Sequence, residues 1–114
     1  MTAWESLVEE AKRLINENPT AKQAIVLRTL NGNVYHLALE EFSDGELLLL
    51  QLREKDDVVV RELVCLWNSF EIDVPSMAFR RGLLALSAGN GEAEVLLQGE
   101  NRFVVKKLRV LMPG

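Results

Sequence analysis

The residues that most often carry chemistry are scarce in this chain. His36 is the only histidine and Cys65 the only cysteine among 114 residues. A Cys–His nucleophilic pair would have to use both, and the strands predicted below place them in different hairpins. Structural zinc needs four ligands, mostly thiolates and imidazoles, which these two residues cannot supply. We expect Cys65 to be a small core residue, and we expect neither a catalytic constellation nor a metal site.

Cofactor and phosphate chemistry has no recognisable motif here either. Neither G-x-x-x-x-G-K-[ST] nor G-x-G-x-x-G occurs in the sequence, so the glycine loops that cradle phosphates are missing. An acidic cluster lies at Glu40, Glu41, Asp44 and Glu46, but it lacks the alternating Asp/Asn loop of an EF-hand. Solvated turn charges explain it better, and we expect no cofactor.

One group of side chains could bind a small molecule. If Asn31 and Gly32 form a two-residue type I′ turn, Arg28 pairs across the hairpin with Tyr35, and His36 lies on the opposite face. Arg28 over the Tyr35 ring would form a cation–π contact. The same residues could line a small anion pocket, and a rim pair at the sheet edge is the competing interpretation.

A second group could bind nucleic acid. The last predicted strand carries four basic residues: Arg102, Lys106, Lys107 and Arg109. Alternation divides them between the two faces of the strand, and only Phe103 interleaves them. A nucleic-acid groove needs one continuous basic track with stacking platforms. Lysines on an edge strand more often prevent aggregation, so nucleic-acid binding is disfavoured.

Composition and charge point to a globular protein in a reducing compartment. Apolar residues make up 48% and charged residues 26% of the chain, close to the average for globular domains. The net charge is −4; residues 1–73 carry 14 acids and 7 bases, whereas residues 74–114 carry 3 acids and 6 bases. No apolar run approaches the length of a membrane span. A start without a signal-peptide pattern and a single cysteine predict a cytoplasmic protein.

Apolar periodicity predicts the elements that must position these residues. A stripe at spacings of three and four indicates a helix over residues 3–17, which Pro19 follows. Pro75, Ser76 and a stripe through Phe79 and Leu83 indicate a second helix over 76–88. Alternation and turn residues predict strands over 22–30, 33–40, 46–53, 58–67, 92–98 and 102–112.

These elements predict one α+β domain over residues 1–114, in the order α-β-β-β-β-α-β-β. The sheet is expected to be mostly antiparallel, with about six strands and two packed helices. The hairpin over 22–40 is apolar on both faces. Both faces therefore need covering, by the helices or by a second copy of the chain.

The leading functional hypothesis is a non-enzymatic protein-interaction module that recognises a protein partner or itself, with a homodimer as one form. Small acidic α+β proteins of this composition include bacterial immunity proteins and antitoxins. The alternative hypothesis is a small-molecule-binding protein or enzyme with an anion pocket around Arg28, Tyr35 and His36.

Overall fold

The computed structural model describes residues 3–40 and 45–113 of the chain. Within them lie three α-helices, five strands and two short 3₁₀ helices. The helices are α1 (Ala3–Glu17), α2 (Gly45–Glu54) and α3 (Met77–Leu86). The strands are β1 (Gln23–Thr29), β2 (Val34–Leu39), β3 (Val60–Trp67), β4 (Glu94–Gln98) and β5 (Phe103–Lys107). The 3₁₀ helices are Ala88–Glu92 and Leu108–Leu111.

The five strands form one mixed sheet in the order β2-β1-β3-β4-β5. β3 and β4 run parallel, because the chain crosses over through α3 between them, and the other neighbouring pairs are antiparallel. The expectation of about six strands in a mostly antiparallel sheet with two helices is therefore wrong in strand number, in the parallel pair and in the number of helices. The predicted helices over 3–17 and 76–88 are confirmed as α1 and α3.

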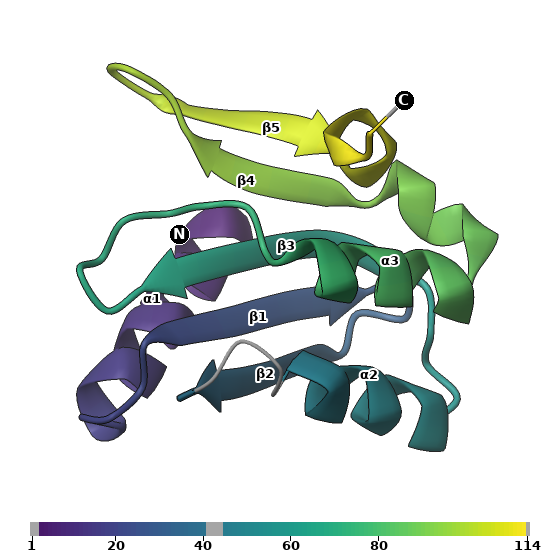
Figure 1. Ribbon diagram of the computed structural model, residues 1–114, viewed down its shortest axis with the longest axis horizontal. Helices are drawn as coiled ribbons and strands as arrows, with labels where there is room; N and C mark the ends of the chain where they lie inside the picture. Colours follow the sequence, from purple (N-terminus) through teal and green to yellow (C-terminus); the bar gives the residue numbers. More distant parts are fainter. Residues whose placement is uncertain (1–2, 41–44, 114) are drawn as a thin grey trace.

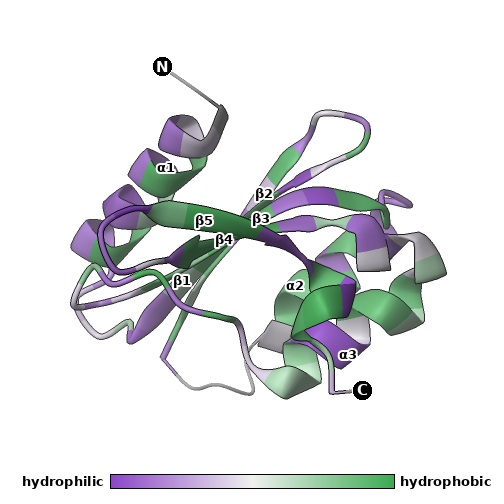
Figure 2. Cartoon of the chain, turned by 90° about the horizontal axis from the view of Figure 1, so that it is seen from above, coloured by the Kyte–Doolittle hydropathy of each residue, from purple (hydrophilic) through white to green (hydrophobic). Residues whose placement is uncertain are grey.

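Helices cover both faces of the sheet, so the molecule has three layers (Figures 1 and 2). One face packs against α1 through a core that includes Leu7, Val26 and Val64. The other packs against α2 and α3 through a core that includes Leu48 and Phe79. The hairpin that is apolar on both faces is thus covered internally. This apolarity consequently gives no reason to expect a homodimer.

The segment predicted as a strand over 46–53 is helix α2. Its run of leucines fits both a period of two and a helical period, because four consecutive apolar residues satisfy either. The burial pattern decides between them. Leu48 and Leu52, four residues apart, are fully buried, whereas Leu47 and Leu50 are exposed. That spacing is the buried stripe of a helix lying on the sheet.

The hairpin between β1 and β2 has a register one residue different from the expected one. Thr29 N–H donates to Asn33 O, and Gly32 N–H donates to Thr29 O, both at 2.9 Å. The loop therefore has three residues, with Gly32 at φ 88° in the left-handed position that ends such turns. As a result Arg28 pairs with Val34, and Leu27 pairs with Tyr35.

One further detail differs from the sequence prediction. The last strand ends at Lys107, and residues 108–111 form a 3₁₀ helix instead of continuing the strand. Residues 70–74 contribute one isolated bridge, Leu66 to Ile72, and no full strand. No helix in the described part of the chain has the length and apolar character needed to cross a membrane.

Candidate functional site

Arg28 and His36 lie on the sheet face that α1 covers, and each faces a carboxylate. Arg28 Nη1 donates to Glu62 Oε1 at 2.6 Å, and both side chains are mostly buried. His36 Nε2 lies 3.8 Å from Glu10 Oε1. The hydrogen bond from Arg13 lowers the pKa of Glu10 below its ordinary value, and the charge of His36 adds to that effect. Arg28 on β1 thus forms a structural ion pair with Glu62 on the neighbouring strand β3.

Tyr35 lies on the opposite face, where it joins a polar cluster around Asp57. The Asp57 carboxylate is buried and accepts hydrogen bonds from Thr29 Oγ1 (2.9 Å), Asn31 Nδ2 (2.9 Å), Asn33 Nδ2 (2.8 Å) and Tyr35 Oη (3.0 Å). Burial raises the pKa of Asp57, but these donors outweigh it, and the net pKa is lowered. The structure therefore does not bring Arg28, Tyr35 and His36 to one pocket. Nothing in the spacing of the sequence identified Asp57 as the centre of a cluster.

The four basic residues at the C-terminal edge do not all belong to one strand. Lys107 Nζ lies 2.6 Å from Glu92 Oε2, and Arg109 Nε lies 3.2 Å from Glu92 Oε1. Arg102 precedes β5, Lys106 lies within it, and Arg109 belongs to the 3₁₀ helix that follows. Two of the four cations are therefore paired with a surface carboxylate.

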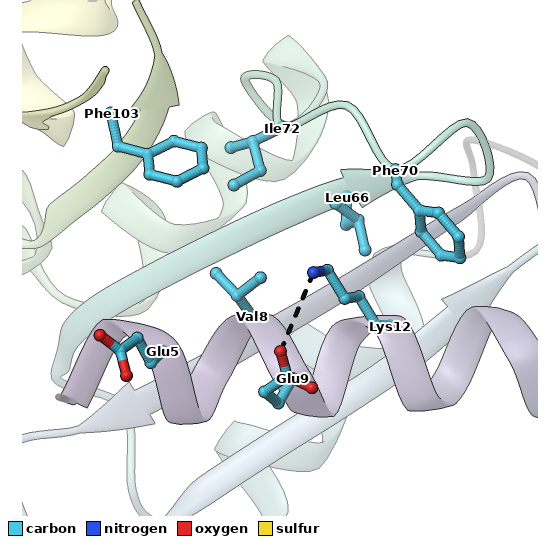
Figure 3. A pocket seen from close by; sticks show the side chains of 8 residues that line it. All are labelled: Glu5, Val8, Glu9, Lys12, Leu66, Phe70, Ile72 and Phe103. Carbon is cyan, nitrogen blue, oxygen red and sulfur yellow. Dashed lines mark ion pairs between the residues drawn. The ribbon is translucent and has the colours of Figure 1, made fainter. Parts of the chain in front are cut away.

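A groove of about 370 Å³ opens between α1 and the sheet (Figure 3). Helix α1 contributes Glu5, Val8, Glu9 and Lys12 to one wall. The other side is formed by Leu66 and Ile72, with Phe70 and Phe103 at the two ends. Sequence reasoning did not find this groove, because its residues come from three segments distant in the chain.

A second feature is the junction where α2 and α3 begin. The buried Phe79 ring fills the space beside Gly45, and a Cβ atom at Gly45 would lie 3.1 Å from Phe79 Cδ1. Ser76 caps α3, its Oγ accepting a hydrogen bond from Phe79 N at 3.2 Å. Glu46 stands in the first turn of α2 with an exposed side chain.

Cys65 lies in the middle of β3 and has no exposed surface. Burial raises the pKa of its thiol far above the usual range, and Asp73 adds to the shift. A neutral, inaccessible thiol is a poor nucleophile. The expectation that Cys65 is a core residue is confirmed.

The fold as a whole resembles that of cytidine deaminases. The cytidine deaminase from Burkholderia pseudomallei matches with a TM-score of 0.72 and 20% identity, over 99% of this chain and 98% of that one. The enzyme from Mycobacterium leprae matches with a TM-score of 0.71 and 12% identity, over the full length of both chains. The enzyme from Mycobacterium tuberculosis matches with a TM-score of 0.65 and 16% identity, over 99% of this chain and 96% of that one. The sequence matches no protein-family model, and no curated protein matches it.

This resemblance corrects three expectations. The end-to-end structural neighbours are enzymes, which overturns the leading hypothesis of a non-enzymatic interaction module and the related expectation that the chain is no enzyme. The expectation of a chain without metal also disagrees with this fold, because zinc deaminases work through a bound zinc ion; whether this chain's own residues fit a zinc ion is a separate question. The alternative hypothesis of a small-molecule protein or enzyme agrees better with the fold.

The zinc ligands themselves do not fit this chain. Zinc deaminases hold the metal through a histidine or cysteine before one helix and a P-C-x-x-C motif at the next. Here the proline, Pro75, is followed by Ser76 and Phe79 at the two cysteine spacings. A phenyl ring therefore stands where a thiolate would be needed. Within residues 3–40 and 45–113, no three His, Cys, Asp or Glu side chains lie close enough together to hold a metal ion.

Proposed function

We propose that this chain, as one domain over residues 1–114, is an enzyme that binds a nucleoside. The observation that carries the proposal is the end-to-end structural match to proteins that are named cytidine deaminases, with TM-scores of 0.71 and 0.72 for two of them. Because one fold can host several functions, the activity depends on the residues of the site. A cytoplasmic location belongs to the proposal, supported by the free thiol of Cys65.

The junction of α2 and α3 is the proposed nucleoside site. Helix N-termini offer backbone N–H donors that the helix itself does not use. Phe79 packs between the two helix starts, and the partly exposed Ser76 adds a hydroxyl beside them. The polar edges of a base and the hydroxyls of a sugar match this set of donors.

Glu46 is the acid–base group of the proposed site. Its carboxylate is exposed in the first turn of α2, one residue from Gly45, against which Phe79 packs. An exposed carboxylate at this position can take a proton from a bound base or return one to it, which typically contributes 10²- to 10⁴-fold, roughly, to a rate.

A turnover experiment tests the proposal. The full chain is incubated with cytidine, adenosine and their analogues, and chromatography follows the loss of substrate and the appearance of product. We expect turnover of at least one nucleoside, and we expect Glu46→Gln to slow it by about 100-fold. Glu54→Gln is the matched control, because Glu54 is an exposed glutamate at the other end of the same helix. Absence of turnover, or equal loss in both variants, would contradict the proposal.

A further inference from the structure

The groove beside α1 lies on the other face of the sheet from the α2–α3 junction. Its volume of about 370 Å³ is within the range of small-molecule pockets. Its apolar surface comes from Val8, Leu66 and Ile72, and Figure 3 shows Phe103 at one end and Phe70 at the other. Both phenyl rings are about half exposed, at 54% and 46%. Two exposed rings at the ends of an apolar groove are suited to stacking against a planar ligand.

The backbone at Phe70 gives independent reason to connect this ring with function. Phe70 N–H donates to Trp67 O at 2.8 Å, and Trp67 N–H donates to Glu71 O at 2.9 Å. This is the hydrogen-bond pattern of the turn that ends at Gly32. In both turns the equivalent residue has positive φ, 88° at Gly32 and 67° at Phe70. Glycine adopts that conformation freely, whereas a bulky residue does so at a cost.

The chain therefore uses glycine in one turn and a strained phenylalanine in the other. The Phe70 side chain does not offset the strain by burial, since it is half exposed. Strained residues of this kind cluster at ligand clamps. Phenylalanine at position 70 places an aromatic ring at the end of the groove, which glycine would not do.

Charge along the α1 wall selects among planar ligands. Glu5 and Glu9 bring two carboxylates to the groove and Lys12 brings one ammonium, with Lys12 Nζ 3.8 Å from Glu9 Oε1. The balance is negative, so an anionic ligand is disfavoured. Carboxylates accept hydrogen bonds from exocyclic amino groups, as they do from the amine of cytosine.

We propose that this groove binds a planar heteroaromatic ring bearing an amino group. The ligand ring stacks on Phe70 at its end of the groove and packs over the apolar surface of Leu66 and Ile72, and its amino group donates to the carboxylates on α1. This site goes beyond the proposed nucleoside site, because it lies on the opposite face of the sheet and is built from different residues.

Binding of adenosine and inosine to the full chain tests the inference. The two nucleosides differ in carrying an amino group or an oxygen at the same ring position. We expect adenosine to shift the backbone amide signals of Val8, Glu9, Phe70 and Phe103 in NMR spectra. We expect inosine to bind at least about fivefold more weakly, because it cannot donate to the carboxylates. Adenosine 5′-monophosphate is expected to bind more weakly than adenosine, because of its charge.

Phe70→Gly separates ligand binding from folding. We expect it to weaken adenosine binding by about tenfold, since a stacking ring is lost. We also expect its melting temperature to be equal to or above that of the unmodified chain, because the backbone strain is relieved. Leu30→Ala is the control, because Leu30 is an exposed apolar residue in the equivalent turn, away from the groove.

Three results would overturn the inference: equal affinity for adenosine and inosine, unchanged affinity in Phe70→Gly, or a lower melting temperature of that variant. The last result would mean that the ring is held for packing. Shifts confined to α2 and α3 would exclude the groove while leaving the proposed function intact. Shifts confined to the groove would support this inference and count against the nucleoside site at the helix junction.

Discussion

The hydroxyl of Tyr35 donates a hydrogen bond to Asp57 Oδ2 over 3.0 Å, and this bond ties strand β2 to the connection between α2 and β3. Thr29, Asn31 and Asn33 donate to the same carboxylate from the hairpin turn. One buried carboxylate thus holds the β1–β2 hairpin against the end of α2.

Asp57→Asn is expected to destabilise the fold by about 2 kcal/mol, because an amide cannot accept all four hydrogen bonds and the lost bonds are to a charged group. Urea unfolding measures the change. Asp56→Asn is the matched control, since Asp56 is exposed with φ 51°, a conformation that asparagine tolerates. A similar loss of stability in both variants would show that Asp57 is not the centre of the cluster.

The same cluster makes stability depend on pH. The pKa of Asp57 is lower in the folded chain than its ordinary value of 3.8. The ionised Asp57 therefore contributes its full stabilisation of the fold above pH 3.8. This stabilisation is lost as the pH falls from that value through the lower pKa of the folded state. Free energies of unfolding measured between pH 2 and 6 should decrease at the acidic end, with a shallower decrease in Asp57→Asn. Identical slopes for the two proteins would contradict this account.

Arg28 and Glu62 form an ion pair whose side chains are only 20% and 12% exposed. Removing one partner leaves the other partly buried and unpaired, so Arg28→Met and Glu62→Gln should each cost about 1–2 kcal/mol. The double variant should cost less than their sum by about 1 kcal/mol. The exposed pair Arg13–Glu17 provides a comparison cycle with a coupling of about 0.3–0.5 kcal/mol. Equal couplings in the two cycles would show that burial does not strengthen the Arg28 pair.

Helices α2 and α3 approach each other closely at Gly82. A Cβ atom at Gly82 would lie 2.3 Å from Leu49 Cδ1. Alanine in a helix interior is favoured over glycine by about 1 kcal/mol. In a Leu49→Ala background, we expect Gly82→Ala to raise the free energy of unfolding by about 1 kcal/mol. With Leu49 present, we expect most of that gain to disappear, because the new methyl group would overlap the Leu49 side chain. Thermal unfolding of the unmodified chain, the two single variants and the double variant measures the coupling between positions 49 and 82. Additive effects of the two substitutions on stability would contradict the contact.

The sequence predicted elements well where one pattern excluded the others. The stripe of α1, closed by Pro19, has no competing interpretation, and the stripe through Phe79 and Leu83 likewise predicted α3. The leucines from Leu47 to Leu50 fit two periods equally, so only packing on the sheet could identify α2 as a helix.

The candidate site was harder to predict, because it depends on register and on distant segments. A loop longer by one residue at Gly32 moved Tyr35 to the face opposite Arg28, since each residue of slip exchanges the faces of a strand. The groove combines α1 with Leu66, Phe70 and Phe103, which no local pattern connects. Resemblance to cytidine deaminases emerged only from the three-dimensional arrangement, at identities of 12–20%.

Titration of the full chain with cytidine, followed by amide NMR spectra, tests the central claim most directly. We expect saturable shifts at Gly45, Glu46 and the residues that open α3, with weaker shifts for ribose alone. Spectra that remain unchanged at millimolar cytidine would contradict the claim that this chain binds a nucleoside at the junction of α2 and α3.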